Sequence, residues 1–122
     1  MWRRGILALA VVLVLSPGPG SSQSLVPLVV GWETTFRIDG TLGEERGQRV
    51  IQGYIENRSG LDTKRIRLLV DALENGRVVG QRVSWLGTEL TAGSRRYFTV
   101  PAPAQSSTYR VSVFDFDVRR PP

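Results

Sequence analysis

Apolar and polar residues alternate along most of this chain, and that alternation constrains its fold more than any other feature. Between residues 66 and 72 every second residue is apolar, whereas Arg67 and Asp71 occupy positions between them. Successive side chains of a β-strand point to opposite faces, so this period indicates a strand with one buried face. The same pattern occurs in residues 32–39, 49–57, 94–100 and 108–113. The sequence therefore predicts an all-β domain.

Asn75-Gly76 separates two of these strands and predicts a hairpin. Both central residues of a type I′ turn need positive φ, which Asn and Gly tolerate best. A two-residue turn at this point sets the register of the strands that it joins. The predicted partners are Glu74 with Arg77, Ala72 with Val79, Leu68 with Val83, and Ile66 with Trp85.

The last predicted strand, residues 108–118, changes its apolar parity partway. Tyr109, Val111 and Val113 share one parity, whereas Phe114, Phe116 and Val118 have the opposite one. A β-bulge near Val113 and Phe114 would turn the phenylalanines inward, or the strand lies between two apolar surfaces. With turn signals about every 10 residues, the whole pattern is typical of an antiparallel β-sandwich.

Gly53 and Asn57 occupy inward positions in residues 49–57. Gly53 leaves space on the inner face, and we expect a neighbouring aromatic ring to lie against the backbone there. Asn57 needs hydrogen-bond partners if it is buried. Asn side chains bond nearby backbone in turns, so one interpretation is a cap that ends the strand. The triplet Asn57-Arg58-Ser59 is also a glycosylation acceptor pattern, which is the alternative.

The N-terminus has the order of a secretory signal. Arg3 and Arg4 precede an apolar run over residues 5–15, and small residues follow it. The run is shorter than the roughly 20 residues of a spanning helix. We expect a signal peptide at residues 1–22, a linker at 23–31 and one domain at 32–119. The protein is then exported, periplasmic or extracellular; an uncleaved anchor is the alternative.

Composition limits the chemistry of the chain. It contains no cysteine and no histidine, which removes disulfides, thiolate metal sites and the usual general base. Serine has no histidine to activate it, so we expect neither an enzyme nor a cofactor. The net charge of +5 falls by two when Arg3 and Arg4 leave with the signal, and the remaining arginines are scattered among acids. We therefore expect no nucleic-acid partner, and no membrane contact apart from the N-terminal signal.

Four stretches resemble the FxLYD-type domains of exported bacterial proteins, namely IQGYIENRSG, DALENGRVV, LTAGSRRYFTV and YRVSVFDFD. The resemblance covers essentially residues 32–119, although the closing FDFD departs from the tetrapeptide that names the family. It implies an antiparallel immunoglobulin-like β-sandwich of about six to seven strands. It also implies an unassigned function with no catalytic residues to transfer, and it favours the cap interpretation of Asn57.

Asp115 and Asp117 are the candidate metal ligands. They lie two residues apart on one strand, so both carboxylates project from the same face. With Glu56 or Asp71 they could hold Ca²⁺, which takes oxygen ligands. Ion pairs with Arg110 or Arg119 are the alternative. A calcium- or small-ligand-binding sandwich is accordingly the second functional hypothesis.

Exposed apolar side chains provide the first functional hypothesis, because an apolar patch on a sheet face marks an interface. Leu69 and Leu73 lie on one face of their strand, and Val78 lies opposite Leu73 in the predicted hairpin. We expect a binding or interaction module of the bacterial envelope, with another envelope protein or a second copy as partner. The residues of outward parity are Tyr54, Leu69, Leu73, Val78 and Tyr97.

Overall fold

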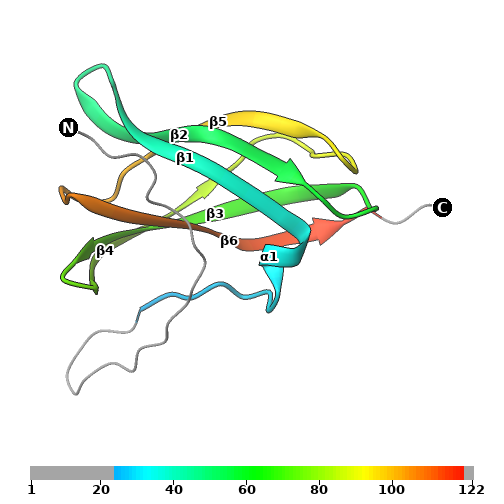
Figure 1. Cartoon of the computed structure of the whole chain (residues 1–122), viewed down its shortest axis with the longest axis horizontal. Helices are drawn as coiled ribbons and strands as arrows, with labels where there is room; N and C mark the ends of the chain where they lie inside the picture. The colour runs from blue at the N-terminus through cyan, green and yellow to red at the C-terminus, as the bar shows by residue number, and fades with distance from the viewer. Residues whose placement is uncertain (1–23, 120–122) are drawn as a thin grey trace.

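The computed structural model describes residues 24–119, which form a two-layer antiparallel β-sandwich (Figure 1). One sheet has the strand order β1-β2-β5 and the other the order β4-β3-β6. The all-β prediction is confirmed. The elements in chain order are α1 (Trp32–Thr35), β1 (Phe36–Glu45), β2 (Gln48–Asn57), β3 (Thr63–Glu74), β4 (Arg77–Trp85), β5 (Arg95–Pro101) and β6 (Thr108–Val118).

The core lies between the two sheets and contains the alternating apolar residues of both. From β3, Ile66, Leu68, Val70 and Ala72 are each fully buried, as their parity predicts. Within residues 24–119, no helix is long and apolar enough to cross a bilayer. The predicted signal at residues 1–22 lies outside the described residues.

Residues 32–35 do not continue β1, which corrects the expectation of a strand from residue 32. They form the single helical turn α1, and Trp32 packs into the core from it with 6% exposure. Gly31 precedes this turn in the left-handed conformation, with φ 81°. The alternation of Trp32 with Phe36 therefore reflects two buried side chains, one on a turn and one on a strand.

The β3–β4 hairpin has the predicted two-residue turn, because Asn75 and Gly76 have φ values of 52° and 78°. Glu74 lies opposite Arg77 as expected, but the register shifts by one residue between Leu73 and Ala72. Val79 is the extra residue of β4. Leu69 therefore lies opposite Val83, and Arg67 opposite Trp85, so the predicted Leu68–Val83 and Ile66–Trp85 pairs are wrong, as is Ala72–Val79.

Gly80 explains the shift. A Cβ at this position would lie 2.9 Å from the Cβ of Ala104, in the connection that crosses from β5 to β6. A side chain at position 80 would push the β5–β6 connection away from β4. The bulge at Val79 places Gly80, which has no side chain, beside this connection. The bulge leaves the Val79 side chain 52% exposed.

The predicted bulge in β6 is confirmed. Leu68 pairs with Val113 while the preceding Arg67 pairs with Asp115, so Phe114 is the extra residue. Beyond it Phe116 turns inward and packs edge-on against Phe36, with ring centroids 4.9 Å apart. Phe114 itself lies on the outer side, under the guanidinium of Arg67, so the expected inward turn is wrong for Phe114 and holds for Phe116.

Tyr109 fixes the crossing from one sheet to the other at the start of β6. Its hydroxyl donates to the Ala104 carbonyl and accepts from the Ser106 amide at 3.0 Å. Immunoglobulin-like sandwiches carry such a tyrosine corner, in which the hydroxyl bonds backbone a few residues upstream. Tyr109 is 3% exposed, so its ring also fills the core.

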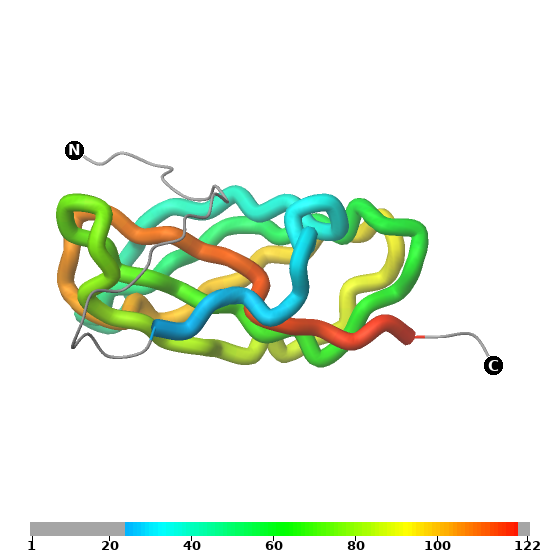
Figure 2. Tube along the Cα trace, turned by 90° about the horizontal axis from the view of Figure 1, so that it is seen from below, coloured from blue at the N-terminus to red at the C-terminus, as the bar shows by residue number. Residues whose placement is uncertain are grey.

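Residues 24–30, here named the N-terminal strap, cross the outer face of the β4-β3-β6 sheet. Figure 2 views the molecule from the side of this sheet and shows the strap, in blue, in front of it. The strap bonds Gln81 of β4 through Leu25 and the Phe114 carbonyl of β6 through the Leu28 amide at 2.8 Å. It therefore spans the sheet from one edge strand to the other.

Candidate functional site

Asn57 is a buried structural residue at the end of β2, with no exposed surface. Its side-chain nitrogen donates to the carbonyls of Leu61 and Leu90 at 2.8 and 2.9 Å. Its oxygen accepts from both the amide and the hydroxyl of Ser59, at 2.9 and 2.8 Å. The side chain thus ties two loops to the strand end. The nitrogen that a glycan would need is buried and bonded, so the structure rules out the glycosylation alternative for the folded chain.

Gly53 permits close approach between two backbones. A Cβ there would lie 1.9 Å from the Asp39 carbonyl oxygen of β1, which is far inside contact distance. Phe98 of β5 is the aromatic residue opposite Gly53. Its ring lies 3.7 Å from a Cβ built on Gly40, the residue of β1 that pairs with Gly53. The tightest constraint at Gly53 is therefore the β1 backbone, not a ring.

Asp115 and Asp117 each pair with an arginine of β3. Arg67 forms a two-point contact with Asp115, including a bond from Nε to Oδ1 at 2.8 Å. Arg65 lies 3.5 Å from Asp117. The arginines proposed for this role, Arg110 and Arg119, pair instead with Asp71 and Glu89.

The other candidate calcium ligands do not join this pair. Glu56 lies on β2 in the opposite sheet, and Asp71 is held by Arg110. Among the residues that the structure describes, no three acidic side chains form a group that could hold a metal ion. The structure thus does not bring the four carboxylates together.

Added calcium should leave the thermal stability of the chain unchanged, because each aspartate already has a cationic partner. We expect the melting temperature to be the same with and without millimolar Ca²⁺. Differential scanning calorimetry measures this directly. A rise of several degrees that disappears in the Asp115→Asn, Asp117→Asn double variant would establish a calcium site.

Trp85 ends β4 with 61% of its surface exposed and one side of its ring near Arg67. The guanidinium carbon of Arg67 lies 5.3 Å from the Trp85 centroid and 5.1 Å from that of Phe114. The hydrogen bond to Asp115 raises the pKa of Arg67 above its ordinary value, although desolvation acts in the opposite direction. Arg67 is therefore a fixed cation between two rings and a carboxylate. Trp85 therefore lies against Arg67 on β3 and does not pair with Ile66 as expected.

Leu69 is buried, with 1% exposure, so the expectation that it belongs to an exposed interface is wrong. It points outward from β3, as predicted, but the N-terminal strap is anchored on both sides of it. Its cross-strand neighbours are Val83 and Ser112. Leu73 and Val78 pair as predicted and are half-buried. The apolar face proposed from the sequence is thus largely covered by the chain itself.

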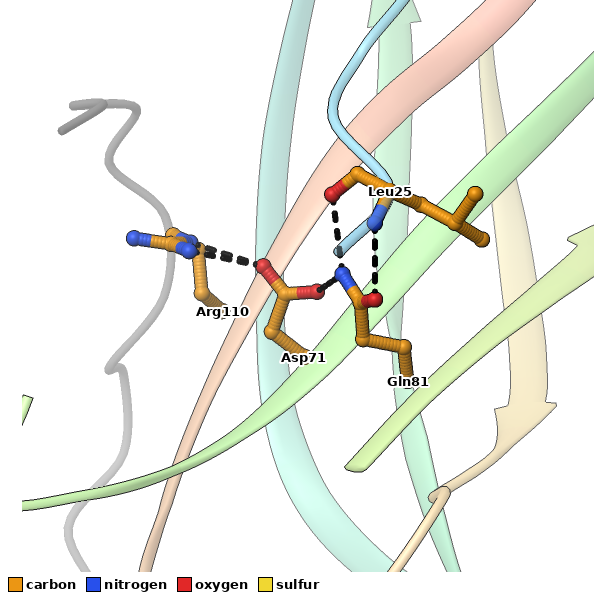
Figure 3. A network of polar contacts seen from close by, with 4 residues as sticks. All are labelled: Leu25, Asp71, Gln81 and Arg110. Carbon is orange, nitrogen blue, oxygen red and sulfur yellow. Dashed lines mark hydrogen bonds and ion pairs between the residues drawn. The ribbon is translucent and has the colours of Figure 1, made fainter. Parts of the chain in front are cut away.

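A polar network attaches the strap to this face (Figure 3). Asp71, only 2% exposed, accepts two hydrogen bonds from Arg110 and one from Gln81 at 2.8 Å. The Gln81 amide also bonds both the N–H and the carbonyl of Leu25, each at 2.9 Å. The amide thus pairs with the strap as a neighbouring strand would, and it links the strap to the buried carboxylate.

Tyr54 and Tyr97 are the predicted interface residues that remain exposed, by 42% and 53%. They lie opposite each other on β2 and β5, on the outer face of the other sheet. Their rings meet edge to face with centroids 5.6 Å apart, and the Arg95 guanidinium lies 4.2 Å from the Tyr54 centroid. The Tyr97 hydroxyl donates to Gln52 at 3.2 Å. We name Gln52, Tyr54, Arg95 and Tyr97 the tyrosine face.

The five residues of outward parity lie on both sheets, Tyr54 and Tyr97 on one and Leu69, Leu73 and Val78 on the other. The apolar segment LVPLVV at residues 25–30 could have indicated that one face is covered. Its composition is more typical of a segment that packs on a surface than of a linker. Comparison of the chain with protein-family models, characterised proteins and solved structures found no match.

Proposed function

We propose that the chain is an exported, non-enzymatic binding module of the bacterial envelope that binds a partner protein through the tyrosine face. The observation that carries this proposal is the contrast between the two outer faces. The β4-β3-β6 face holds the N-terminal strap, while Tyr54 and Tyr97 of the β1-β2-β5 face are half exposed to solvent. The partner is another envelope protein or a second copy.

The residue types of the tyrosine face favour a protein partner. Tyrosine and arginine are enriched among the residues that contribute most to binding in protein interfaces. Here the contacts of Tyr54 with Arg95 and of Tyr97 with Gln52 hold the side chains in place before binding. Such ordering lowers the entropic cost of association.

Export and the absence of catalysis rest on the sequence. The order of charged, apolar and small residues at the N-terminus supports secretion. The chain lacks histidine and cysteine, so nucleophilic and general-base chemistry would have few groups to use. The resemblance to FxLYD-type domains agrees with both points.

A photo-reactive amino acid at position 97, introduced in the cells that produce the chain, tests the proposal. We expect a cross-linked adduct of defined mass, which decreases severalfold in a Tyr54→Ser background. An adduct of twice the chain's mass identifies a second copy, and another defined mass identifies a different protein.

Val79 is the matched control position. Its exposure of 52% nearly equals that of Tyr97, but it lies on β4 of the opposite sheet. Irradiation of the chain labelled at position 79 should not give the adduct that depends on Tyr54. The proposal fails if position 97 yields no adduct, or if both positions yield the same set.

A further inference from the structure

The outer face of the β4-β3-β6 sheet is covered by an extended apolar segment, the N-terminal strap. Beneath the N-terminal strap, Leu69, Asp71, Ser112 and Phe114 are at most 8% exposed. The segment that this face accepts is seen directly, because it is residues 24–30 of the same chain. Recognition uses the strap backbone, since Gln81 bonds the N–H and the carbonyl of Leu25.

The strap is held lightly for a segment that covers so much of a sheet. Within residues 24–119 it makes three hydrogen bonds to the sheet, through the two backbone groups of Leu25 and the amide of Leu28. Four of its apolar side chains are exposed, Leu25 by 46%, Val26 by 63%, Leu28 by 61% and Val30 by 97%, while Pro27 and Val29 are half-buried. Its detachment breaks these three hydrogen bonds and uncovers the residues beneath it, so an identical segment is needed to cover them again.

Gly31 is the hinge between the strap and the domain. Its φ of 81° and ψ of 17° turn the chain from the sheet face into α1, where Trp32 is anchored in the core. No side chain caps this end of α1. A change of Gly31 to an extended conformation would direct the strap away from its own sheet while Trp32 stays in place.

We propose that two copies of the chain exchange straps, so that residues 24–30 of each copy lie on the β4-β3-β6 face of the other. A second copy is the occupant that fits, because it carries the identical segment and makes identical contacts. Exchange of identical elements is a low-cost route to a dimer, and concentration favours it. The two hinges then lie where the copies meet, next to the exposed Val30 of each copy.

Gly31→Ala tests the hinge, because alanine is strained in the left-handed conformation but not in the extended one. The exchanged dimer relieves that strain at both hinges. We expect the ratio of dimer to monomer to increase at least fivefold, measured as solution mass over a concentration series of the purified chain.

Gly47→Ala is the matched control, since Gly47 has φ 80° and open space around its Cα, as Gly31 has. It lies in the β1–β2 turn, where strap exchange would not relieve the backbone strain of an alanine. We expect its mass to follow that of the unaltered chain. A Gly31→Ala chain that stays monomeric throughout, or equal dimerisation of both variants, overturns the proposal.

A cross-link distinguishes strap exchange from association through the tyrosine face. The chain has no cysteine, so single thiols can be placed freely. In the Gly31→Ala background, Leu25→Cys in one copy and Val83→Cys in another should be joined by a short bis-maleimide. Thr99→Cys in place of Val83→Cys should give no product. A dimer that joins positions 25 and 99, but not 25 and 83, refutes exchange and leaves the tyrosine face as the contact.

Discussion

Gly53→Ala should lower the free energy of unfolding by about 3 kcal/mol, the upper part of the range for an overpacked interior. The new Cβ would meet the Asp39 carbonyl oxygen at 1.9 Å and the Cα of Gly40 at 2.6 Å. Both atoms belong to the backbone of β1, which pairs with β2 at this point. A flexible side chain could move aside, but this backbone cannot shift without breaking the β1–β2 ladder.

Gly60→Ala provides the control for that experiment. Gly60 is exposed in the β2–β3 loop, and nothing lies within 4 Å of a Cβ built there. Chemical denaturation of both variants should show a large loss at position 53 and a change within about 0.5 kcal/mol at position 60. Equal stabilities of the two variants would mean that β1 and β2 are not in close contact at Gly53.

Asn57→Ala should also cost about 3 kcal/mol, because it leaves several buried polar groups without their partner. The Leu61 carbonyl and the Ser59 amide lose the bonds that they make to the side chain. The β2–β3 loop and the segment around Leu90 lose their common attachment. The loss is measured by urea unfolding followed by tryptophan fluorescence.

Asn57→Asp distinguishes the contribution of the side-chain nitrogen of Asn57 from that of its side-chain oxygen. Aspartate retains the oxygen that accepts from Ser59 but replaces the donor that binds Leu61 and Leu90. We expect no rescue, since a carboxylate would then face two carbonyl oxygens. Arg58→Ala, at the exposed neighbouring position, should be nearly neutral. A loss below a few tenths of a kcal/mol in Asn57→Ala would contradict the structural role of Asn57.

Local patterns predicted the parts of the fold that local physics determines. The alternation in β3 identified its buried face, because strand side chains alternate whatever the partner strand is. Asn75-Gly76 predicted its turn, since few residues accept positive φ twice in succession. The parity change at Phe114 predicted a bulge, because side chains keep alternating between the two faces of a strand unless an extra residue is inserted.

Features that depend on distant contacts were not predictable in this way. The bulge at Val79 follows from the approach of Ala104 to Gly80, which are far apart in the chain. Trp32 has the parity of β1, yet it lies on a helical turn because Gly31 reverses the chain before it. Burial of Leu69 depends on the N-terminal strap, which periodicity within β3 cannot indicate.

The side chains expected to be exposed differ in their actual exposure for a definable reason. Parity tells which side chains point out of a sheet, and Tyr54, Leu69 and Tyr97 all do. It does not tell whether another segment covers them. Only Tyr54 and Tyr97 of these three reach solvent, while Leu69 lies beneath the strap.

Thiol reactivity at positions 69 and 97 tests the central claim, that residues 24–30 cover Leu69 on one outer face while Tyr97 on the other is exposed. The chain has no cysteine, so Leu69→Cys and Tyr97→Cys each report one site without background. In the folded chain the thiol at position 97 should react with a maleimide at the rate of an unfolded peptide. The thiol at position 69 should react at least a hundredfold more slowly, on the order of the protection that a few kcal/mol of local stability provides. Equal rates at the two positions would show that the strap does not cover the sheet.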